Sequence, residues 1–439
     1  MKDGTETIPN QNWNYWAYTV EGVFFISSSA FWEPGTVLPA YLSGLVSSPV
    51  LLGLGPAIKN AGWMLPQLVV AGYAEGLSRK KPIVILASVI GRIAFLGLPL
   101  LALAPGVPDY TRALAFLGLY GIFCFAEGIT AVPWTEMLGR AVPARLRGRL
   151  LGNMQSLAGV AALLAGLLVR LVLTHPGLRY PVNYALLFSL AAVLLFGSGF
   201  SMYMVREPAG TDPRARRPLR EHLRGIPGRL RANPAFRRLL FSRLLAGSAN
   251  LALPFYILYG RQVLGLPAAY VGNSVAAQML GSVAGGLLWA RVSYRWGYRP
   301  LILASCLTGA LIPAWTLLAG AASAWPILAW LAPYLFLMTY VTIGLYFTSV
   351  WVGFTNYLLE IVAVDERPTY IGILSTLVGP TAFLAAPGGV LVGALGYTPV
   401  FVLAMVGSLA AAASARLLPA EQAARDFSAA AAGTDGAQG

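Results

Sequence analysis

Five ionisable residues lie inside otherwise apolar stretches of this chain, and all five fall in its first half. A charged group in the hydrocarbon region of a membrane costs several kcal/mol unless it is paired or hydrated. Each of these residues is therefore a candidate for binding a cargo molecule or a proton, and we expect any ion coupling to reside in the first half. They are Glu21, Glu33, Lys59, Arg92 and Glu127.

Glu33 and Lys59 are predicted to lie at one depth on two consecutive spans of opposite direction. At 1.5 Å per residue, each lies about 12 Å from the outer end of its span. Pro34 and Gly35 follow Glu33, so we expect the helix to kink or break there, as is tolerated where backbone lines a cavity. The two residues could form a static ion pair or bind cargo or a proton, and the sequence leaves both interpretations open.

Arg92 and Glu127 are predicted to form a second pair. By the same residue count, each lies about 13–15 Å from the inner face of the membrane. We interpret them as a structural ion pair that stabilises the first half, and we keep Glu127 as a candidate for proton binding. Glu21 is expected near the inner end of its span, where its side chain can reach toward the membrane interface.

Other polar and aromatic residues could line a cavity for a small molecule. Lys59, Trp63 and Gln67 recur every four residues and so share one helix face. Aromatic rings, including Trp134, suit small amphipathic cargo. Each polar residue could instead make a helix–helix hydrogen bond. The remaining candidates are Trp32, Gln155, Asn250, Gln278 and Tyr346.

Motifs for catalysis and for nucleotide binding are missing from the sequence. It contains no G-x-x-x-x-G-K-[ST] phosphate-binding loop, so ATP hydrolysis within this chain is not expected to supply energy. No Ser/His/Asp set and no metal-ligand spacing is present, and Cys124 and Cys306 both lie in apolar stretches. We expect no enzymatic activity, no cofactor and no metal.

The apolar stretches themselves predict an all-α integral membrane protein. The chain of 439 residues is 57% hydrophobic and 11% charged, whereas soluble proteins are about 25% charged. The stretches are continuous rather than alternating, and about 20 residues cross a bilayer as a helix. We predict twelve spans, at 16–42, 50–74, 83–104, 112–134, 151–173, 182–204, 240–262, 269–289, 300–320, 326–353, 370–394 and 397–418.

The second half of the chain repeats the first. At an offset of 220 residues, Leu138, Val142 and Arg147 fall on Leu358, Val362 and Arg367. Two matching halves indicate pseudo-symmetric six-helix bundles, with a seam where transporters bind cargo. The predicted parts are an N-terminus at 1–14, bundles at 15–205 and 240–418, a basic linker at 206–239 and a disordered tail at 419–439.

The basic residues are distributed unevenly about these spans. The net charge is +14, and with the N-terminus inside, 25 of the 31 basic residues fall on one side. This asymmetry places both termini in the cytoplasm. The positive charge then faces anionic lipid headgroups, and this attraction is worth about 1 kcal/mol per basic residue near the surface. We therefore expect contact with lipid rather than with nucleic acid. We expect a monomer.

The six-plus-six spans, the basic central loop and the repeated short loops resemble the major facilitator superfamily over essentially the whole chain. Its signature loop, roughly G-x-x-x-D-R-x-G-R-R, follows spans two and eight. The second copy here carries Arg295, Gly297 and Arg299, whereas Gly76 stands in the first copy where arginine is usual. The resemblance implies gating loops, whose further candidates are Glu75, Arg79, Lys80, Lys81, Arg147 and Arg367.

This resemblance implies a secondary transporter of a bacterial inner membrane, with two bundles that rock about a central site. The patterns of drug–proton antiporters and sugar porters are absent; after span six the chain has only Arg206, Glu207 and Pro208. We expect export of a small amphipathic molecule coupled to protons through Glu33 or Glu127. Uptake or facilitated diffusion of a metabolite or sugar, and a non-transporting lipid-handling, receptor or assembly role, remain alternatives.

Overall fold

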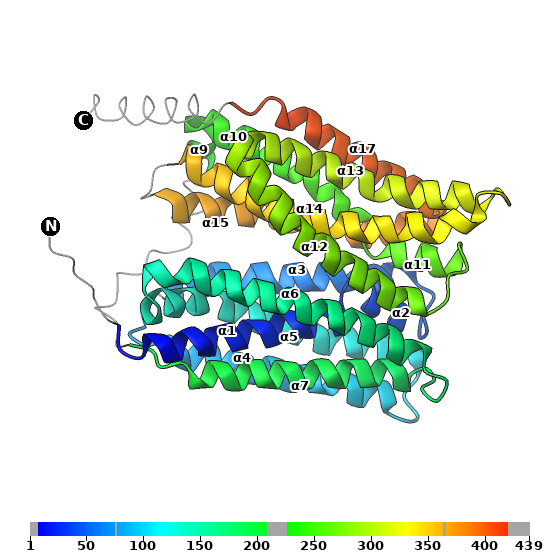
Figure 1. Cartoon of the computed structure of the whole chain (residues 1–439), viewed down its shortest axis with the longest axis horizontal. Coiled ribbons are helices and arrows are strands. Elements are labelled where there is room, and N and C mark those ends of the chain that lie inside the picture. Colours follow the sequence, from blue (N-terminus) through cyan, green and yellow to red (C-terminus); the bar gives the residue numbers. More distant parts are fainter. Residues whose placement is uncertain (1–7, 75–76, 209–225, 363–365, 420–439) are drawn as a thin grey trace. The chain divides into compact units, whose positions relative to one another are not determined.

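A computed structural model describes residues 8–74, 77–208, 226–362 and 366–419, and the regular structure in these ranges is helical (Figure 1). The predicted all-α fold is confirmed. Most of the predicted linker and tail lies outside the described residues. The chain divides into two compact units, one of residues 1–33 and 58–218 and the other of residues 34–57 and 219–439.

Unit 1 is built from the helices of the first half of the chain. It contains α1 (Gln11–Ser29), η1 (Ala30–Trp32), α3 (Pro49–Ala74) from Ile58 onward, α4 (Lys81–Leu103), α5 (Asp109–Ala141), α6 (Ala144–Thr174) and α7 (Val182–Met204). Within it, α1 packs against α6 and α7, and α4 packs against α5 and α7.

Unit 2 contains the second half of the chain together with α2 (Val37–Leu42) and the start of α3. Its helices are α9 (Ile226–Ala232), α10 (Pro234–Ala246), η2 (Gly247–Leu251), α11 (Phe255–Gln262), α12 (Ala269–Trp296), α13 (Tyr298–Ser323), η3 (Ala329–Leu331), α14 (Ala332–Ile361), α15 (Arg367–Val378), η5 (Gly379–Leu384), α16 (Ala385–Leu395) and α17 (Tyr397–Ala415).

The segment 34–57, which the predicted boundaries assign to the first bundle, packs with unit 2. Glycines allow the backbones to approach closely there. A Cβ on Gly53 would lie 2.5 Å from the Ala385 carbonyl oxygen, and one on Gly389 would lie 2.5 Å from the Pro49 carbonyl oxygen. The predicted boundaries of the linker remain predictions.

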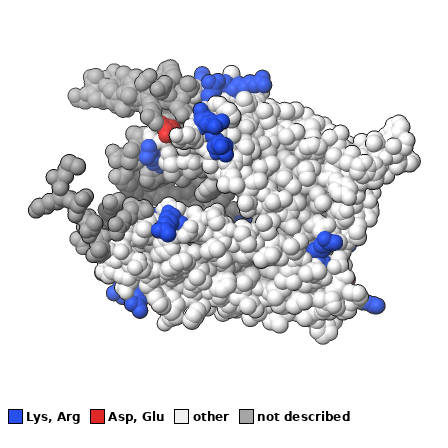
Figure 2. All heavy atoms as spheres, viewed as in Figure 1, with Lys and Arg blue, Asp and Glu red and all other residues white. Residues whose placement is uncertain are grey.

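Ten helical segments of the described residues are long and apolar enough to cross a membrane, and they correspond to the third to twelfth predicted spans. The first predicted span carries Glu21 and is interrupted at Glu33, and the second carries Lys59. Figure 2 shows a face on which most side chains are neither basic nor acidic, as contact with lipid tails requires.

The first predicted span of each half is divided into shorter helical pieces. α1 gives way to η1, and Glu33 then takes an extended conformation (φ −50°, ψ 119°) before Pro34. The predicted break at Glu33–Pro34 is therefore confirmed. In the second half α10 gives way to η2, and α11 starts after Pro254.

The repeat seen in the sequence is also a repeat of contacts. α5 ends at Ala141 and α14 ends at Ile361, 220 residues later. Arg147 Nη2 donates to the Gly139 carbonyl, and Arg367 Nη2 donates to the Leu359 carbonyl, again at an offset of 220. Equivalent arginines thus bind equivalent helix ends in the two units.

Candidate functional site

Arg92, in the middle of α4, lies at the centre of a buried polar network in unit 1. Its side chain is only 4% exposed. Nε donates to the Leu195 carbonyl at 2.7 Å, and Nη1 donates to the Ser88 carbonyl at 3.2 Å and to Glu127 Oε1 at 2.9 Å. Nη2 donates to Ser198 Oγ at 3.3 Å. The structure thus brings Arg92 and Glu127 together as a buried ion pair.

Glu21 on α1 joins the same network. Ser198 Oγ donates to Glu21 Oε1 at 3.2 Å, and Trp134 Nε1 donates to Glu21 Oε2 at 3.1 Å. Glu21 is only 8% exposed. The expectation that it reaches the membrane interface is wrong, because α7 offers a hydroxyl group in the interior.

Small residues on α7 make room for these side chains. A Cβ on Gly199 would lie 2.7 Å from Arg92 Nε, and a Cβ on Gly197 would lie 3.2 Å from the ring of Phe24. Ser201 Oγ donates to the Ala17 carbonyl at 2.8 Å. The face formed by Gly197, Ser198 and Ser201 therefore lets α7 lie close to α1 and α4.

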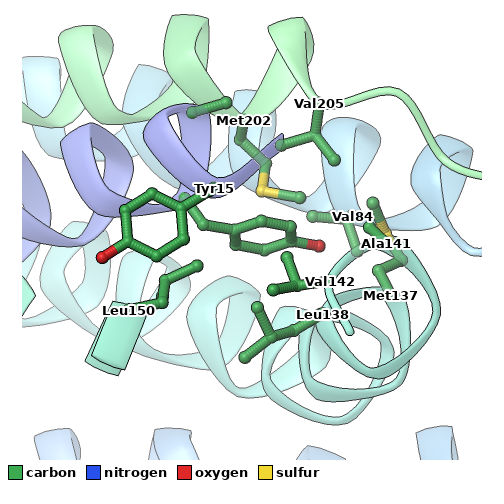
Figure 3. Close-up of a cluster of buried hydrophobic side chains, with 11 residues drawn as sticks. Tyr15, Val84, Met137, Leu138, Ala141, Val142, Leu150, Met202 and Val205 are labelled. Atoms are coloured by element: carbon green, nitrogen blue, oxygen red, sulfur yellow. The ribbon is translucent and has the colours of Figure 1, made fainter. Parts of the chain in front are cut away.

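An apolar cluster closes one end of this network. Its side chains come from the starts of α1, α4 and α6 and from the ends of α5 and α7, and Figure 3 shows them pointing toward one another. Trp134 packs against the cluster, and its ring meets Tyr18 edge-on at 5.4 Å. The cluster comprises Tyr15, Ala17, Tyr18, Val84, Met137, Leu138, Ala141, Val142, Leu150, Met202 and Val205.

Glu33 and Lys59 do not form the predicted ion pair among the described residues. Lys59 Nζ instead lies 5.5 Å from the ring centroid of Trp32. Glu33 is 7% exposed and sits in the extended turn after η1 rather than on a helix. Counting residues along a continuous helix therefore misplaced its side chain, although the same sequence predicted the break.

Of the three tryptophans considered for cargo, Trp32 is buried and Trp134 is partly buried. Trp32 is 3% exposed and meets the rings of Phe95, Tyr120 and Phe123 at 6.1, 5.8 and 5.4 Å. The indole N–H of Trp134 donates a hydrogen bond to Glu21. Trp63, by contrast, is 40% exposed.

The amide and tyrosine candidates lie at separate places. Gln67 Nε2 donates to the Trp63 carbonyl at 2.8 Å, Gln155 is exposed and Gln278 is buried. In unit 2, Asn250 and Tyr346 both line a cavity of about 10 Å³, enough for one water molecule. An open apolar groove of about 350 Å³ in unit 1 lies between α4 and α5 and includes Ile90, Ile122 and Phe125.

Two of the predicted gating residues, Lys80 and Lys81, lie at the start of α4. Lys80 is fully buried, and its Nζ lies 3.2 Å from Glu136 Oε2. The backbone N–H groups of Lys80 and Lys81 donate to the carboxylate of Glu207 at 2.8 and 2.9 Å. Lys81 Nζ donates to the Val205 carbonyl at 2.8 Å. Sequence reasoning missed Glu207 as a partner.

The other gating candidates are more dispersed. Arg79 and Arg295 are exposed, and Glu75 lies outside the described residues. Gly297 ends α12 with φ 82°, a conformation that favours glycine. Arg299 Nη2 donates to the Arg416 carbonyl at 2.8 Å.

Solved structures of transporters share this fold. A D-xylose-proton symporter superposes with a TM-score of 0.70 at 15% identity, covering 93% of this chain and 98% of that one. The nucleoside transporter NupG superposes with a TM-score of 0.64 at 12% identity, covering 92% of this chain and 98% of that one. A bacterial homologue of the iron transporter ferroportin superposes with a TM-score of 0.68 at 12% identity, covering 92% of this chain and 97% of that one. At these identities the likeness shows the fold alone.

Relatives in sequence include uncharacterized protein Rv2209 of Mycobacterium tuberculosis and uncharacterized protein Mb2232 of Mycobacterium bovis. Each is 27% identical over 308 residues, which cover 69% of this chain. The match spans 58% of the length of these relatives.

The family comparison covers nearly the whole chain. Residues 22–386 match the Major Facilitator Superfamily. A multi-pass membrane protein of a transporter family, rather than an enzyme, accounts for the apolar helices and for the two related halves. The chain belongs to the Major Facilitator Superfamily.

Proposed function

We propose that this protein is a secondary transporter that moves a small molecule across a bacterial inner membrane by alternating access, coupled to protons. The observation that carries the coupling is the buried network of Glu21, Arg92 and Glu127 in unit 1. Ionisable groups at membrane depth are costly, and they mark proton and substrate pathways in transporters.

The direction of transport that we propose is export of a small amphipathic molecule. Trp63 supports an amphipathic cargo, since its side chain is 40% exposed, whereas Trp32 is buried and the Trp134 indole donates to Glu21. Proton-coupled uptake of a metabolite or sugar is the second candidate, because one structure with this fold is named as a D-xylose-proton symporter.

The orientation and partners are proposals as well. The positive-inside asymmetry supports cytoplasmic termini, and the basic residues on that side support contact with anionic headgroups. We propose that the transporter acts as a monomer. Reporter fusions at the C-terminus test the orientation, because a reporter active only in the periplasm would contradict it.

The experiment that tests the proposed function records internal pH in proteoliposomes with a trapped dye. A panel of drugs, sugars and nucleosides is added outside, with empty liposomes as the control. A proton antiporter makes the interior more alkaline when its cargo enters, whereas a symporter makes it more acidic. The sign of the pH change therefore separates the two candidates.

Two further controls sharpen this experiment. Asp109→Asn alters a carboxylate that is 62% exposed at the start of α5, and we expect it to leave the pH change intact. Labelled cargo that enters without a pH change would contradict proton coupling. The absence of any cargo movement across the panel, with folded protein, would favour the non-transporting alternative.

A further inference from the structure

The buried network of unit 1 contains two carboxylates and one guanidinium. With both acids ionised, Glu21, Arg92 and Glu127 together carry one negative charge in the membrane interior. An uncompensated buried charge is strongly unfavourable, whereas a single bound proton makes the set neutral. The composition of the network therefore favours binding one proton.

The two carboxylates are not equivalent. Glu127 accepts a charged hydrogen bond directly from Arg92 at 2.9 Å, and such bonds are about twice as strong as neutral ones. Glu21 accepts only neutral donors, the Ser198 hydroxyl at 3.2 Å and the Trp134 indole at 3.1 Å. Of the two acids, Glu21 is the one that has no charged hydrogen-bond partner among the described residues.

The groups that face Glu21 come from each helix packed around it. Its own helix carries Tyr18 one turn earlier, whose ring lies against Trp134. Gly22, the next residue, packs against the side chain of Met154, which does not titrate. From α4, α5, α6 and α7, the groups around Glu21 are Arg92, Glu127, Trp134, Met154 and Ser198.

We propose that Glu21 is the proton-binding residue of this protein and that Glu127 is the fixed counter-ion of Arg92. The inference rests on the proton coupling of the proposed function and assigns that coupling to the carboxylate of Glu21. A proton from hydronium binds a carboxylate oxygen of Glu21 and leaves water. Release to the other side of the membrane reverses that step.

Ser198 gives the bound proton a structural consequence. In the described arrangement the Ser198 hydroxyl accepts from Arg92 and donates to Glu21. Protonated Glu21 is itself a donor, so the Ser198 hydroxyl no longer needs to donate to it. Proton binding thus changes the hydrogen bond that connects α1 to α7.

The apolar cluster of Figure 3 fits this assignment. It lies at the end of unit 1 where α7 leads into the linker, and Tyr18 within it is fully buried. Tyr18 precedes Glu21 by one turn of α1, so the cluster lies between Glu21 and the start of that helix. A proton site that is closed on one side is what coupled transport needs, since free access from both sides would leak protons.

The test is infrared difference spectroscopy of the full chain in lipid nanodiscs at neutral and acidic pH, with protons as the only ligand. The wild-type protein should gain the carbonyl stretch of a buried carboxylic acid on acidification. Glu21→Gln should lose that band, whereas the matched variant Glu127→Gln should keep it. Exposed acids contribute equally to all three spectra and cancel in the comparison.

Ser198→Ala keeps the proposal testable if Glu127→Gln fails to fold. It removes one hydrogen bond to Glu21 and leaves both acids in place, so the band should shift in frequency without losing intensity. The proposal is overturned if Glu21→Gln retains the band, if only Glu127→Gln loses it, if Ser198→Ala leaves its frequency unchanged, or if the wild-type protein shows no pH-dependent band.

This test is independent of the transport assay. A wild-type protein that moves no protons with any cargo would overturn the proposed function, whatever the infrared spectrum shows. Cargo-dependent proton movement that persists in Glu21→Gln would overturn the assignment alone. If the proposed function and the assignment of Glu21 are both correct, Glu21→Gln loses proton-driven accumulation of cargo. The variant retains exchange of labelled for unlabelled cargo.

Discussion

Unit 1 and unit 2 repeat one set of helix contacts but differ in the chemistry of their interiors. In unit 1, α3 and α5 cross where a Cβ on Gly128 would lie 2.2 Å from the Gly62 carbonyl oxygen. In unit 2, α12 and α14 cross where a Cβ on Gly344 would lie 2.1 Å from the Gln278 carbonyl oxygen. Close backbone approach at glycine is thus common to both units.

Among the described residues, unit 2 has no buried ion pair: Arg243 lies 5.3 Å from the ring centroid of Phe354, and hydrogen bonds between neutral groups connect the helices. Thr316 Oγ1 lies 2.9 Å from Thr339 Oγ1, and Tyr346 OH donates to the Ala246 carbonyl at 2.7 Å where α10 gives way to η2. At an offset of 220 from Arg92 and Glu127 stand Ile312 and Phe347. The positions that carry the ion pair in one unit are apolar in the other.

The difference separates what the fold requires from what the function requires. Glycine crossings and arginine contacts at helix ends occur twice, so they belong to the architecture. Among the described residues, an ion pair with both side chains buried occurs only in unit 1, although it costs free energy that a neutral contact avoids. The equivalent positions in unit 2 are apolar, so the fold does not require an ion pair there, which supports a functional role for the pair in unit 1.

The largest effect is expected from Arg92→Leu. It leaves Glu21 and Glu127 buried without their counter-ion, which should destabilise the protein by about 3–5 kcal/mol. Thermal unfolding in detergent, followed by size-exclusion chromatography, measures the loss. Thr316→Val in unit 2 is the comparison, since it removes only neutral hydrogen bonds, with Thr339 and with the Ile312 carbonyl, each worth about 1 kcal/mol.

The double variant Arg92→Leu/Glu127→Leu controls for lost packing. It removes both members of the pair, so it should be more stable than Arg92→Leu alone, with Glu21 as the remaining buried acid. Equal instability of the two variants would indicate that the volume of the arginine side chain matters more than its charge.

The second effect concerns the glycine crossings. A Cβ on Gly281 would lie 2.0 Å from the Val341 carbonyl oxygen, and one on Gly62 would lie 2.7 Å from Cys124 Cβ. Alanine is favoured over glycine in a helix by about 1 kcal/mol, but moving two backbones apart costs about 1–3 kcal/mol. Gly62→Ala and Gly281→Ala should therefore both lower the melting temperature.

Gly118→Ala and Gly286→Ala are the matched controls on α5 and α12, because a Cβ at either position meets nothing within 4 Å. These variants should be neutral or slightly more stable. If only one of Gly62→Ala and Gly281→Ala destabilised the protein, the two crossings would not be equivalent.

The sequence predicted the architecture well because apolar length and repetition are properties of the chain itself. Ten of the twelve predicted spans meet the length and hydropathy expected of a membrane helix, and the Pro34 break is present. The Arg92–Glu127 pair followed from equal depth on regular helices. Residue counting is reliable where a helix is continuous, as α4 and α5 are.

The parts of the site that were missed depend on tertiary contacts. Glu33 left the helical register at the break, so its predicted depth did not place it against Lys59. Glu21 looked like an interface residue because Ser198, its partner, is 177 positions away. Glu207 appeared only as part of an incomplete motif, although its carboxylate binds the start of α4.

The smallest predicted effect concerns the arginines at the two equivalent helix ends. Arg147→Lys and Arg367→Lys keep the positive charge, but the ammonium of lysine lacks the planar set of donors that reaches the Gly139 and Leu359 carbonyls. Each variant should lose about 1 kcal/mol of stability. Because the two arginines donate to different carbonyls in different units, the double variant should lose the sum of the single losses to within about 0.5 kcal/mol. Chemical denaturation of the purified protein in mixed micelles measures all three variants. A loss of stability confined to Arg147→Lys would mean that only the end of α5 depends on this contact. The two units would then share the geometry of the contact but not its contribution to stability.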